Sequence, residues 1–255
     1  MSGSGPAPPV VCKLGGSVVT EKGRQETLDE AAIDRSVAAI ARARTEGALD
    51  SLVLVHGGGS FGHHHATDHG VDTRHGTHDG EAVRAIHGAM VRLNEAICSR
   101  LTAAGVPVVP VHPLSVAHRG GDGTLDLPTA SIELALQEGF VPVTHGDLVV
   151  HAGEGATVVS GDELVVSLAE STSASRVGLC STVPGVLDAD ERVIERIDDY
   201  ADVATVLGES DATDVTGGMA AKVRALLDLE APASVFGPED LSAFLDGERP
   251  GTTVG

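Results

Sequence analysis

Apolar residues recur along the chain in two different spacings, and these spacings predict strands that alternate with helices. Short runs rich in β-branched residues are too short for helices and indicate buried strands of a parallel sheet. Longer segments repeat apolar residues every three or four positions, as in a helix with one buried face. The runs that indicate strands lie at 10–14, 53–55, 106–111, 140–145, 176–181 and 234–236. This alternation predicts an α/β fold with a parallel sheet.

Helices are expected between most of these strands. The capping box Thr27-Leu28-Asp29-Glu30 predicts a helix that starts near residue 27, and Gly47 ends it. The strongest helical pattern runs from 81 to 104, and its first turns could also wall an apolar substrate pocket. A hairpin is expected from 148 to 159, and a polar excursion at 118–126. Further helices are expected at 129–138, 160–171, 198–207, from about 214, and at 238–245.

Length and composition indicate one folded domain. The 255 residues, 42% of them hydrophobic, suffice for one large domain or for two lobes around a continuous sheet. No apolar run approaches the ~20 residues of a membrane helix. Residues 1–9 are rich in Gly, Ser and Pro and lack the regions of a signal peptide. We therefore expect a disordered tail at 1–9, a single domain at 10–255, a cytoplasmic location and no membrane partner.

The charge balance narrows the choice of partners and of surroundings. Net charge is −20, and 14 Arg accompany only three Lys. An acidic, lysine-poor surface is typical of proteins that stay hydrated in a cytosol of very high salt. Because no basic face could neutralise a phosphate backbone, nucleic acid is not expected as a partner.

The cysteines indicate buried, reduced thiols. Cys12, Cys98 and Cys180 fall in predicted strands or in a helix, far apart and without C-x-x-C spacing. Neither a disulfide nor a zinc site is expected from them.

The three lysines become informative because lysine is otherwise absent. Lys13 directly precedes a Gly-rich turn, Lys22 follows that turn at short range, and Lys222 comes just after a second Gly-Gly pair. A compact ammonium does there what arginine does less well, such as contacting a phosphate as a point charge. The alternative, that three lysines lie near glycines by chance, stays open at this point.

A glycine loop follows the second predicted strand. It reads Gly57-Gly58-Gly59-Ser60-Phe61-Gly62-His63, and its glycines allow amide groups to converge on an anion. The same letters satisfy G-x-G-x-x-G, and Asp79 or Glu81 supplies an acid about 20 residues on. A nicotinamide-dependent oxidoreductase is therefore one alternative.

Histidines gather after this loop. His63, His64, His65, His69, His75 and His78 lie within 63–78, and His56 lies just ahead of the loop. Without a cysteine or H-E-x-x-H spacing, a metal site is not expected. We expect a mobile flap with solvated histidines, in which the loop fixes only His63.

Five motifs in order carry a resemblance to a known family. They are Lys13-Leu14-Gly15-Gly16-Ser17, the glycine loop ending in His63, His145-Gly146-Asp147, Ser160-Gly161-Asp162-Glu163, and Asp214-Val215-Thr216-Gly217-Gly218-Met219 with Lys222. Together they resemble the amino acid kinase superfamily over almost the whole chain after Pro9. The loop ending Phe-Gly-His is similar to that of the isopentenyl phosphate kinases within it.

The resemblance implies a fold and a reaction. The fold would be α/β, a three-layer αβα sandwich around a mostly parallel sheet, with an acceptor-substrate lobe at about 10–150 and a nucleotide lobe at about 151–255. The reaction would be phosphorylation of isopentenyl phosphate by ATP to isopentenyl diphosphate, in an archaeal mevalonate route. The protein would work as a homodimer, with Mg²⁺ bridging the nucleotide phosphates and keeping several waters.

The resemblance also implies roles for individual residues. Lys13, Lys22, His63 and Lys222 would be catalytic, with Lys22 stabilising the transition state. The acceptor phosphate would be held by Gly58, Gly59, His63 and Gly161. ATP would be held by Lys13, Leu14, Gly15, Gly16, Ser17, Gly59, Thr182, Gly218 and Lys222. Transfer between two phosphates needs positioning and charge neutralisation rather than a strong base, so no catalytic carboxylate is expected.

One run departs from the family. Where its members often carry acids in a Thr-Asp-Val-Asp-Gly-like run, this chain has Ser181-Thr182-Val183-Pro184-Gly185. The departure concerns the nucleotide contact, and the choice of acceptor among small phosphates, phosphonates and carboxylates also stays open. A non-catalytic relative that stores or senses an anion is the remaining alternative.

Overall fold

The main sheet confirms the predicted parallel strands. The structure, a computed structural model, describes residues 7–207 and 218–255, so residues 1–6 of the expected tail lie outside it. Within that part, eight strands follow the order β10-β12-β11-β9-β1-β2-β6-β3, and all neighbours are parallel except β11 and β12. The strands are β1 Val10–Leu14, β2 Leu52–His56, β3 Val108–Pro110, β6 Val141–His145, β9 Arg176–Cys180, β10 Arg196–Ile197, β11 Ala233–Phe236 and β12 Thr252–Val254.

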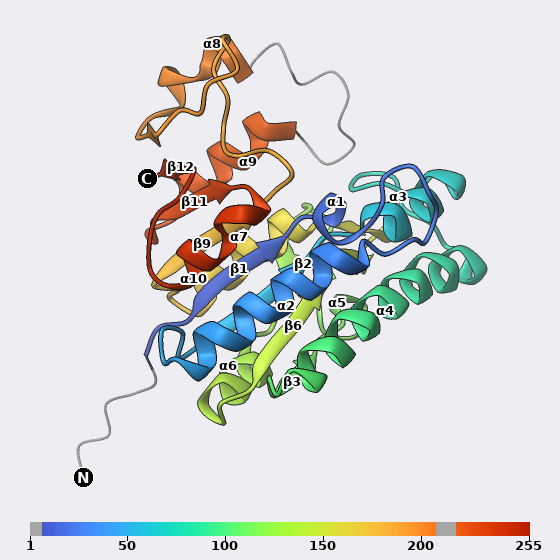
Figure 1. Cartoon of the computed structure of the whole chain (residues 1–255). Helices are drawn as coiled ribbons and strands as arrows, with labels where there is room; N and C mark the ends of the chain where they lie inside the picture. Colours follow the sequence, from blue (N-terminus) through green and yellow to red (C-terminus); the bar gives the residue numbers. More distant parts are fainter. Residues whose placement is uncertain (1–6, 208–217) are drawn as a thin grey trace.

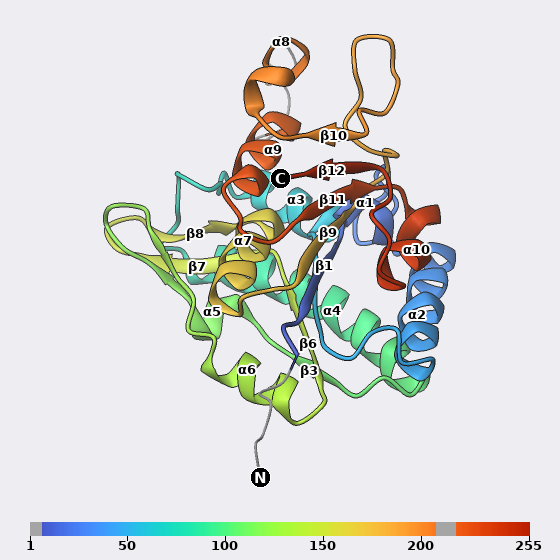
Figure 2. The same ribbon diagram turned by 90° about the vertical axis from the view of Figure 1, so that its left-hand side faces the viewer.

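Alternation along the central strands produces the layers. In β1, Val10, Cys12 and Leu14 pack into one core, whereas Val11 packs into the other. The first core is covered by α2 (Glu30–Thr45), α4 (Gly80–Ala103) and α10 (Leu241–Leu245). The second is covered by α6 (Ala130–Gln137), α7 (Gly161–Ser171) and α9 (Gly218–Leu227). Figures 1 and 2 show the sheet between these helices, which confirms the αβα sandwich.

A second, smaller sheet lies beside the first. It has the order β5-β4-β7-β8, with β4 His118–Arg119, β5 Leu125–Asp126, β7 Asp147–His151 and β8 Gly155–Val159. The predicted hairpin is β7 and β8, paired antiparallel. The expected polar excursion is itself a short hairpin, β4 with β5, which leads from α5 (Pro113–Val116).

Several helix boundaries differ from the predicted ones. The first long helix begins at Glu30, because Asp29 is its N-cap and accepts from Ala32 N, so the capping box at Thr27 is wrong. The segment 198–207 contains two short pieces, η1 (Tyr200–Asp202) and α8 (Ala204–Leu207), instead of one helix. The closing segment divides in the same way into η2 (Pro238–Asp240) and α10. The last strand, β12, was not predicted.

In the histidine-rich stretch, the side chains of His64, His69, His75 and His78 are exposed, as the sequence predicts. The first half of the stretch belongs to α3 (Gly59–Asp68). The glycines at the start of this helix made a loop the expected structure. His65 bonds Glu26, and His75 lies 2.8 Å from Asp72, whose pKa it lowers to about 2. The sequence did not predict these two contacts, because the first joins residues 39 positions apart and the second depends on a local bend of the chain.

The three cysteines are buried, as the sequence predicts. Cys12, Cys98 and Cys180 are free and buried. Burial raises the pKa of the Cys98 thiol to about 11 and that of the Cys180 thiol to about 12. None of the described helices is both long and apolar enough to cross a membrane.

Candidate functional site

Two glycine loops meet at the carboxyl ends of neighbouring parallel strands. The turn after β1 leads into α1 (Gly16–Val19), and the turn after β2 leads into α3. A Cβ on Gly16 would lie 2.2 Å from Gly59 N, and one on Gly57 would lie 2.5 Å from Gly16 N. Gly59 has φ +47°. Only glycine permits this approach and this conformation together, so both loops require these glycines.

A cavity of about 910 Å³ opens above the two loops. The carboxyl ends of β1, β2, β6 and β9 and the N-termini of α3 and α7 surround it, which is where open α/β sheets bind ligands. The predicted site residues that line it are Lys13, Gly15, Gly16, Ser17, Lys22, Gly58, Gly59, His63, Gly161, Thr182 and Lys222. The three lysines of the sequence thus share one cavity.

Two predicted site residues are not among those lining the cavity. The Leu14 side chain is 2% exposed and packs into the core beneath α2. Its carbonyl accepts from Gly57 N at 3.0 Å, so Leu14 joins the two loops through its backbone. Gly218 begins α9 with φ +62°, and the cavity wall is formed by the next residue, Met219, and by Lys222. The preceding part of that motif, 214–217, lies outside the described residues.

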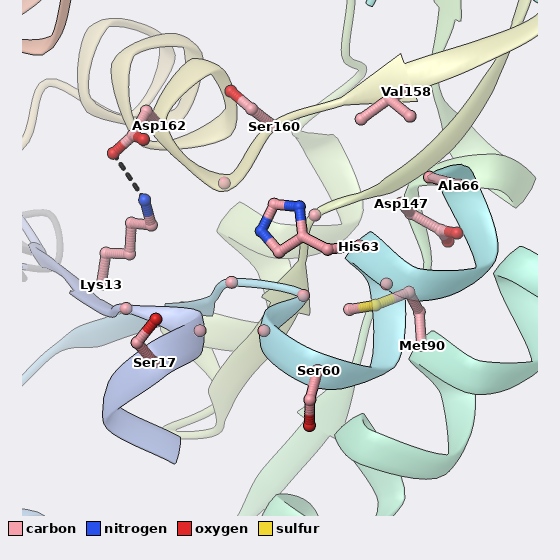
Figure 3. Close-up of a pocket in the computed structure, with 18 of the residues that line it drawn as sticks. Lys13, Ser17, Ser60, His63, Ala66, Met90, Asp147, Val158, Ser160 and Asp162 are labelled. Carbon is pink, nitrogen blue, oxygen red and sulfur yellow. Dashed lines mark hydrogen bonds and ion pairs between the residues drawn. The ribbon is translucent and has the colours of Figure 1, made fainter. Parts of the chain in front are cut away.

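An acidic residue to which the sequence assigned no role, Asp162, links two of the lysines. Lys13 Nζ lies 2.5 Å from Asp162 Oδ1 (Figure 3). Lys222 Nζ lies 3.8 Å from Asp162 Oδ2. Gly161 leaves the room for this pair, because a Cβ there would come within 3.1 Å of Lys13 Cε. The motif Ser160-Gly161-Asp162-Glu163 contained the signal, but residues 149 positions apart meet only in the fold.

Two helix N-termini point their amides at the cavity. Gly58 is the N-cap of α3, and Ser160 is the N-cap of α7. The second start is held by a capping box, in which Ser160 Oγ accepts from Glu163 N at 3.1 Å. Arg119 donates to Glu163 Oε1 at 2.6 Å and so braces the same turn. The N–H groups of the first turn and the helix dipole make both termini suited to phosphate groups.

His63 divides the polar part of the cavity from an apolar end. Figure 3 shows its imidazole between the Lys13–Asp162 pair and a wall that contains Ala66, Met90 and Val158. Ile86, from the first turns of α4, lines this same cavity, as the sequence led us to expect. Gly62 makes room for the Met90 sulfur, which would lie 2.9 Å from a Cβ at that position. The cavity can therefore hold anionic groups beside a short apolar tail.

Beneath this end lies a buried carboxylate that sequence reasoning did not assign. Asp147 lines the cavity with a fully buried side chain, and its Oδ2 lies 2.8 Å from His87 Nδ1. The hydrogen bond from His87 to Asp147 raises the pKa of His87. The raised pKa favours the imidazolium, which compensates the buried negative charge.

A pair of neutral histidines supports the loops from below. His56 and His145 are register partners on β2 and β6, fully buried and stacked at 5.3 Å. Each Nδ1 lies within 3.1 Å of the carbonyl of the glycine that follows it, Gly57 or Gly146. Burial lowers the pKa of His56 to about 4 and that of His145 to about 3. Both rings therefore stay uncharged at neutral pH and can hold the two turns as N–H donors.

Comparison with known proteins matches this architecture to one family. The amino acid kinase family model covers residues 8–231. The isopentenyl phosphate kinase of Haloferax volcanii is 61% identical over 96% of this chain and 98% of its own length. That of Methanothermobacter thermautotrophicus is 32% identical over 86% and 85%. X-ray structures of isopentenyl phosphate kinase include a chain that superposes with a TM-score of 0.80 at 27% identity, covering 96% of this chain and 99% of that one. The chain therefore belongs to the amino acid kinase family and, within it, to the isopentenyl phosphate kinases.

Proposed function

We propose that this protein transfers the γ-phosphoryl group of ATP to isopentenyl phosphate and so forms isopentenyl diphosphate and ADP. The observation that carries the proposal is a single cavity that combines all three lysines and two helix N-termini with a small apolar end. Two phosphorylated groups and a short hydrocarbon tail match those three features. The relatives named isopentenyl phosphate kinase support the same acceptor.

Residues in different parts of the cavity would have different roles in the transfer. Near Lys13 and Lys222, the ammonium groups would neutralise the nucleotide phosphates, and Asp162 would keep both lysines in place. His63 and the amides that start α3 and α7 would hold the acceptor phosphate. An acceptor oxygen then attacks the γ-phosphorus as the bond to the leaving β-phosphate oxygen breaks, and Lys22 would stabilise the charge on the moving group. The acceptor is already anionic, so no base is needed.

Magnesium is part of the proposal as a companion of ATP. Among the described residues, no group of three or more His, Cys, Asp or Glu could hold a metal ion. Mg²⁺ needs no such cage, because one carboxylate, phosphates and water complete its shell. Asp162, beside Lys13 and Lys222, is the carboxylate that would face it, and the ion would supply charge neutralisation on the nucleotide.

The division of the chain and its surroundings complete the proposal. Residues from about 10 to 150 would bind the acceptor and those from about 151 to 255 the nucleotide, with two copies forming a homodimer. Thr182, which lines the cavity, would meet the nucleotide with a hydroxyl. The acidic composition suits a cytoplasm of high salt. At about 1 M salt the screening length is roughly 3 Å, so only charges in contact with the substrates would act.

The two alternative functions, a nicotinamide-dependent oxidoreductase and a non-catalytic anion-binding protein, fit the cavity less well. A nicotinamide site would need the acid after a neighbouring strand, yet Asp79 caps α4 and Glu81 lies in its first turn. The glycines of the fingerprint pack closely against Gly16 and Met90, so their spacing is explained without a dinucleotide. A non-catalytic anion store would have no use for a third lysine in the same cavity.

Phosphorus NMR in high KCl tests the proposal. The protein would be mixed with ATP, Mg²⁺ and, in parallel samples, isopentenyl phosphate, dimethylallyl phosphate, carbamate and acidic amino acids. We expect a diphosphate signal with isopentenyl phosphate. Transfer to carbamate or an amino acid, with none to the prenyl phosphates, would refute the acceptor, and absence of any transfer with intact ATP binding would favour the non-catalytic reading.

A further inference from the structure

Lys22 lies on a surface loop whose fixed contacts are at its base rather than at Lys22. Thr20 and Leu28 pair across the base of the loop, and Glu21 N donates to Thr27 O at 3.0 Å. Lys22 is exposed at the outer part of this loop and lines the cavity. An ammonium on an exposed loop needs support from elsewhere if it is to stay at one place.

Glu26, at the other end of the same loop, supplies a contact to two helices. Its Oε1 lies 2.6 Å from His65 Nε2 on α3, the helix that carries His63. Its two oxygens also accept from Arg92 on α4, at 3.0 Å from Nε and 2.8 Å from Nη2. Such a paired carboxylate–guanidinium contact is among the stronger and more directional ion pairs.

The backbone at Glu26 is held in a conformation that a non-glycine residue seldom adopts. Its φ is +47°, which costs roughly 1–2 kcal/mol for a residue with a Cβ. The amide of Glu26 donates to Ser60 O at 3.1 Å, and Ser60 Oγ donates to Thr27 O at 3.3 Å. A glycine would relieve this strain but could not bind His65 or Arg92. The contacts of the Glu26 side chain therefore explain why a strained non-glycine residue stands here.

We propose that Glu26 is a positioning residue, which fixes the loop of Lys22 against α3 and α4 so that Lys22 and His63 keep their relation in the cavity. The inference rests on the proposed function and names a residue that it did not include. The Glu26 carboxylate is 28% exposed, and its contacts are direct, so molar salt leaves them in force. Partial burial alone would raise the pKa of Glu26, but hydrogen bonds from His65 and Arg92 lower it overall.

A double-mutant cycle with Lys22 separates positioning from mere stabilisation. Glu26→Gln and Lys22→Ala would be made singly and together, and kcat and both KM values measured in high KCl. We expect Glu26→Gln to lower kcat about tenfold with KM for ATP nearly unchanged, because the loss acts on Lys22 in the transition state. In the Lys22→Ala background the same change should alter kcat by less than about twofold.

Companion variants make the result independent of folding. Glu26→Gly eases the backbone yet removes the carboxylate, so it should lose activity as Glu26→Gln does. Glu21→Gln, in the same loop and paired with the exposed Arg24, should match the wild type. If Glu26→Gln does not fold, Arg92→Gln breaks the same contact from its more exposed side.

The possible results distinguish failure of the positioning role of Glu26 from failure of the proposed kinase function. An equal loss from Glu26→Gln with and without Lys22, or full activity in Glu26→Gly, would overturn the positioning role. A wild-type protein that does not phosphorylate isopentenyl phosphate would instead refute the proposed function.

Discussion

The carboxylate of Asp162 holds the ammonium of Lys13 at 2.5 Å inside the cavity, with Lys222 3.8 Å away on its other oxygen. Both partners of the shorter pair are less than one-fifth exposed. In this position the carboxylate orients two cations and limits their net charge, so the cavity can accept polyphosphate without two free ammoniums repelling each other.

Replacing Asp162 by Asn should therefore lower activity more than stability. We expect kcat to fall about tenfold or more, because Lys13 and Lys222 lose their common anchor. Steady-state kinetics and circular dichroism in high KCl measure the two effects. Glu170→Gln, an exposed change on the same helix, is the control. A kcat within twofold of wild type would show that Asp162 does not organise the lysines.

The substitution His63→Ala should weaken binding of the acceptor substrate rather than binding of the nucleotide. Loss of a charge-assisted hydrogen bond to the acceptor phosphate should raise KM for isopentenyl phosphate about tenfold or more and lower kcat, with KM for ATP little changed. His69→Ala changes the exposed C-cap of the same helix and should behave as wild type. Unchanged kinetics in His63→Ala would remove this residue from the site.

The contact between the two glycine loops should be sensitive to a single methyl group. In Gly59→Ala the new Cβ would lie 2.1 Å from Thr20 Oγ1 and 2.5 Å from Gly16 O, at a positive φ. Overpacking and backbone strain together should cost about 3 kcal/mol or more. Gly47→Ala has a similar φ of +74° but no atom within 4 Å, so it isolates the strain and should cost only about 1–2 kcal/mol. Denaturant titration compares them, and equal costs would mean that the loops can move apart.

Stability should fall on acidification because of the buried histidines. In the unfolded chain His56 and His145 titrate near 6.5, whereas in the fold burial lowers their pKa values to about 4 and 3. Between those limits the unfolded chain binds more protons, so the free energy of unfolding decreases as pH falls from about 6.5. His87 acts in the opposite direction, since its raised pKa adds stability that is lost as pH rises through it.

The variant His56→Gln isolates this effect from the many surface carboxylates. Unfolding midpoints measured between pH 7.5 and 4.5 in constant KCl should drop less steeply in His56→Gln than in wild type. Parallel slopes would mean that His56 is protonated without cost in the fold. The comparison uses the difference between two proteins, so common acid effects cancel.

The sequence alone was sufficient wherever neighbouring residues decide the outcome. Short continuous apolar runs rich in β-branched residues identified β1, β2, β6 and β9, because a strand buried on both faces is apolar at nearly every position. The helix predicted at 160–171 is α7, and its start depends on neighbouring residues, since Ser160 and Glu163 form a capping box there. The scarcity of lysine singled out Lys13, Lys22 and Lys222, and these three line one cavity.

Tertiary structure decided what depends on strand order and register. Because β1 pairs in parallel with β2, the glycine turns that follow the two strands lie side by side. Lys13 likewise contacts Asp162, which is 149 positions away in the sequence. The link from Glu26 to α3 and α4, and the pairing of His87 with Asp147, involve residues 39 to 66 positions apart. No local pattern signals such contacts, since each arises only when packing brings two surfaces together. The glycine loop that marks the site in the sequence thus acquires its partners from the fold.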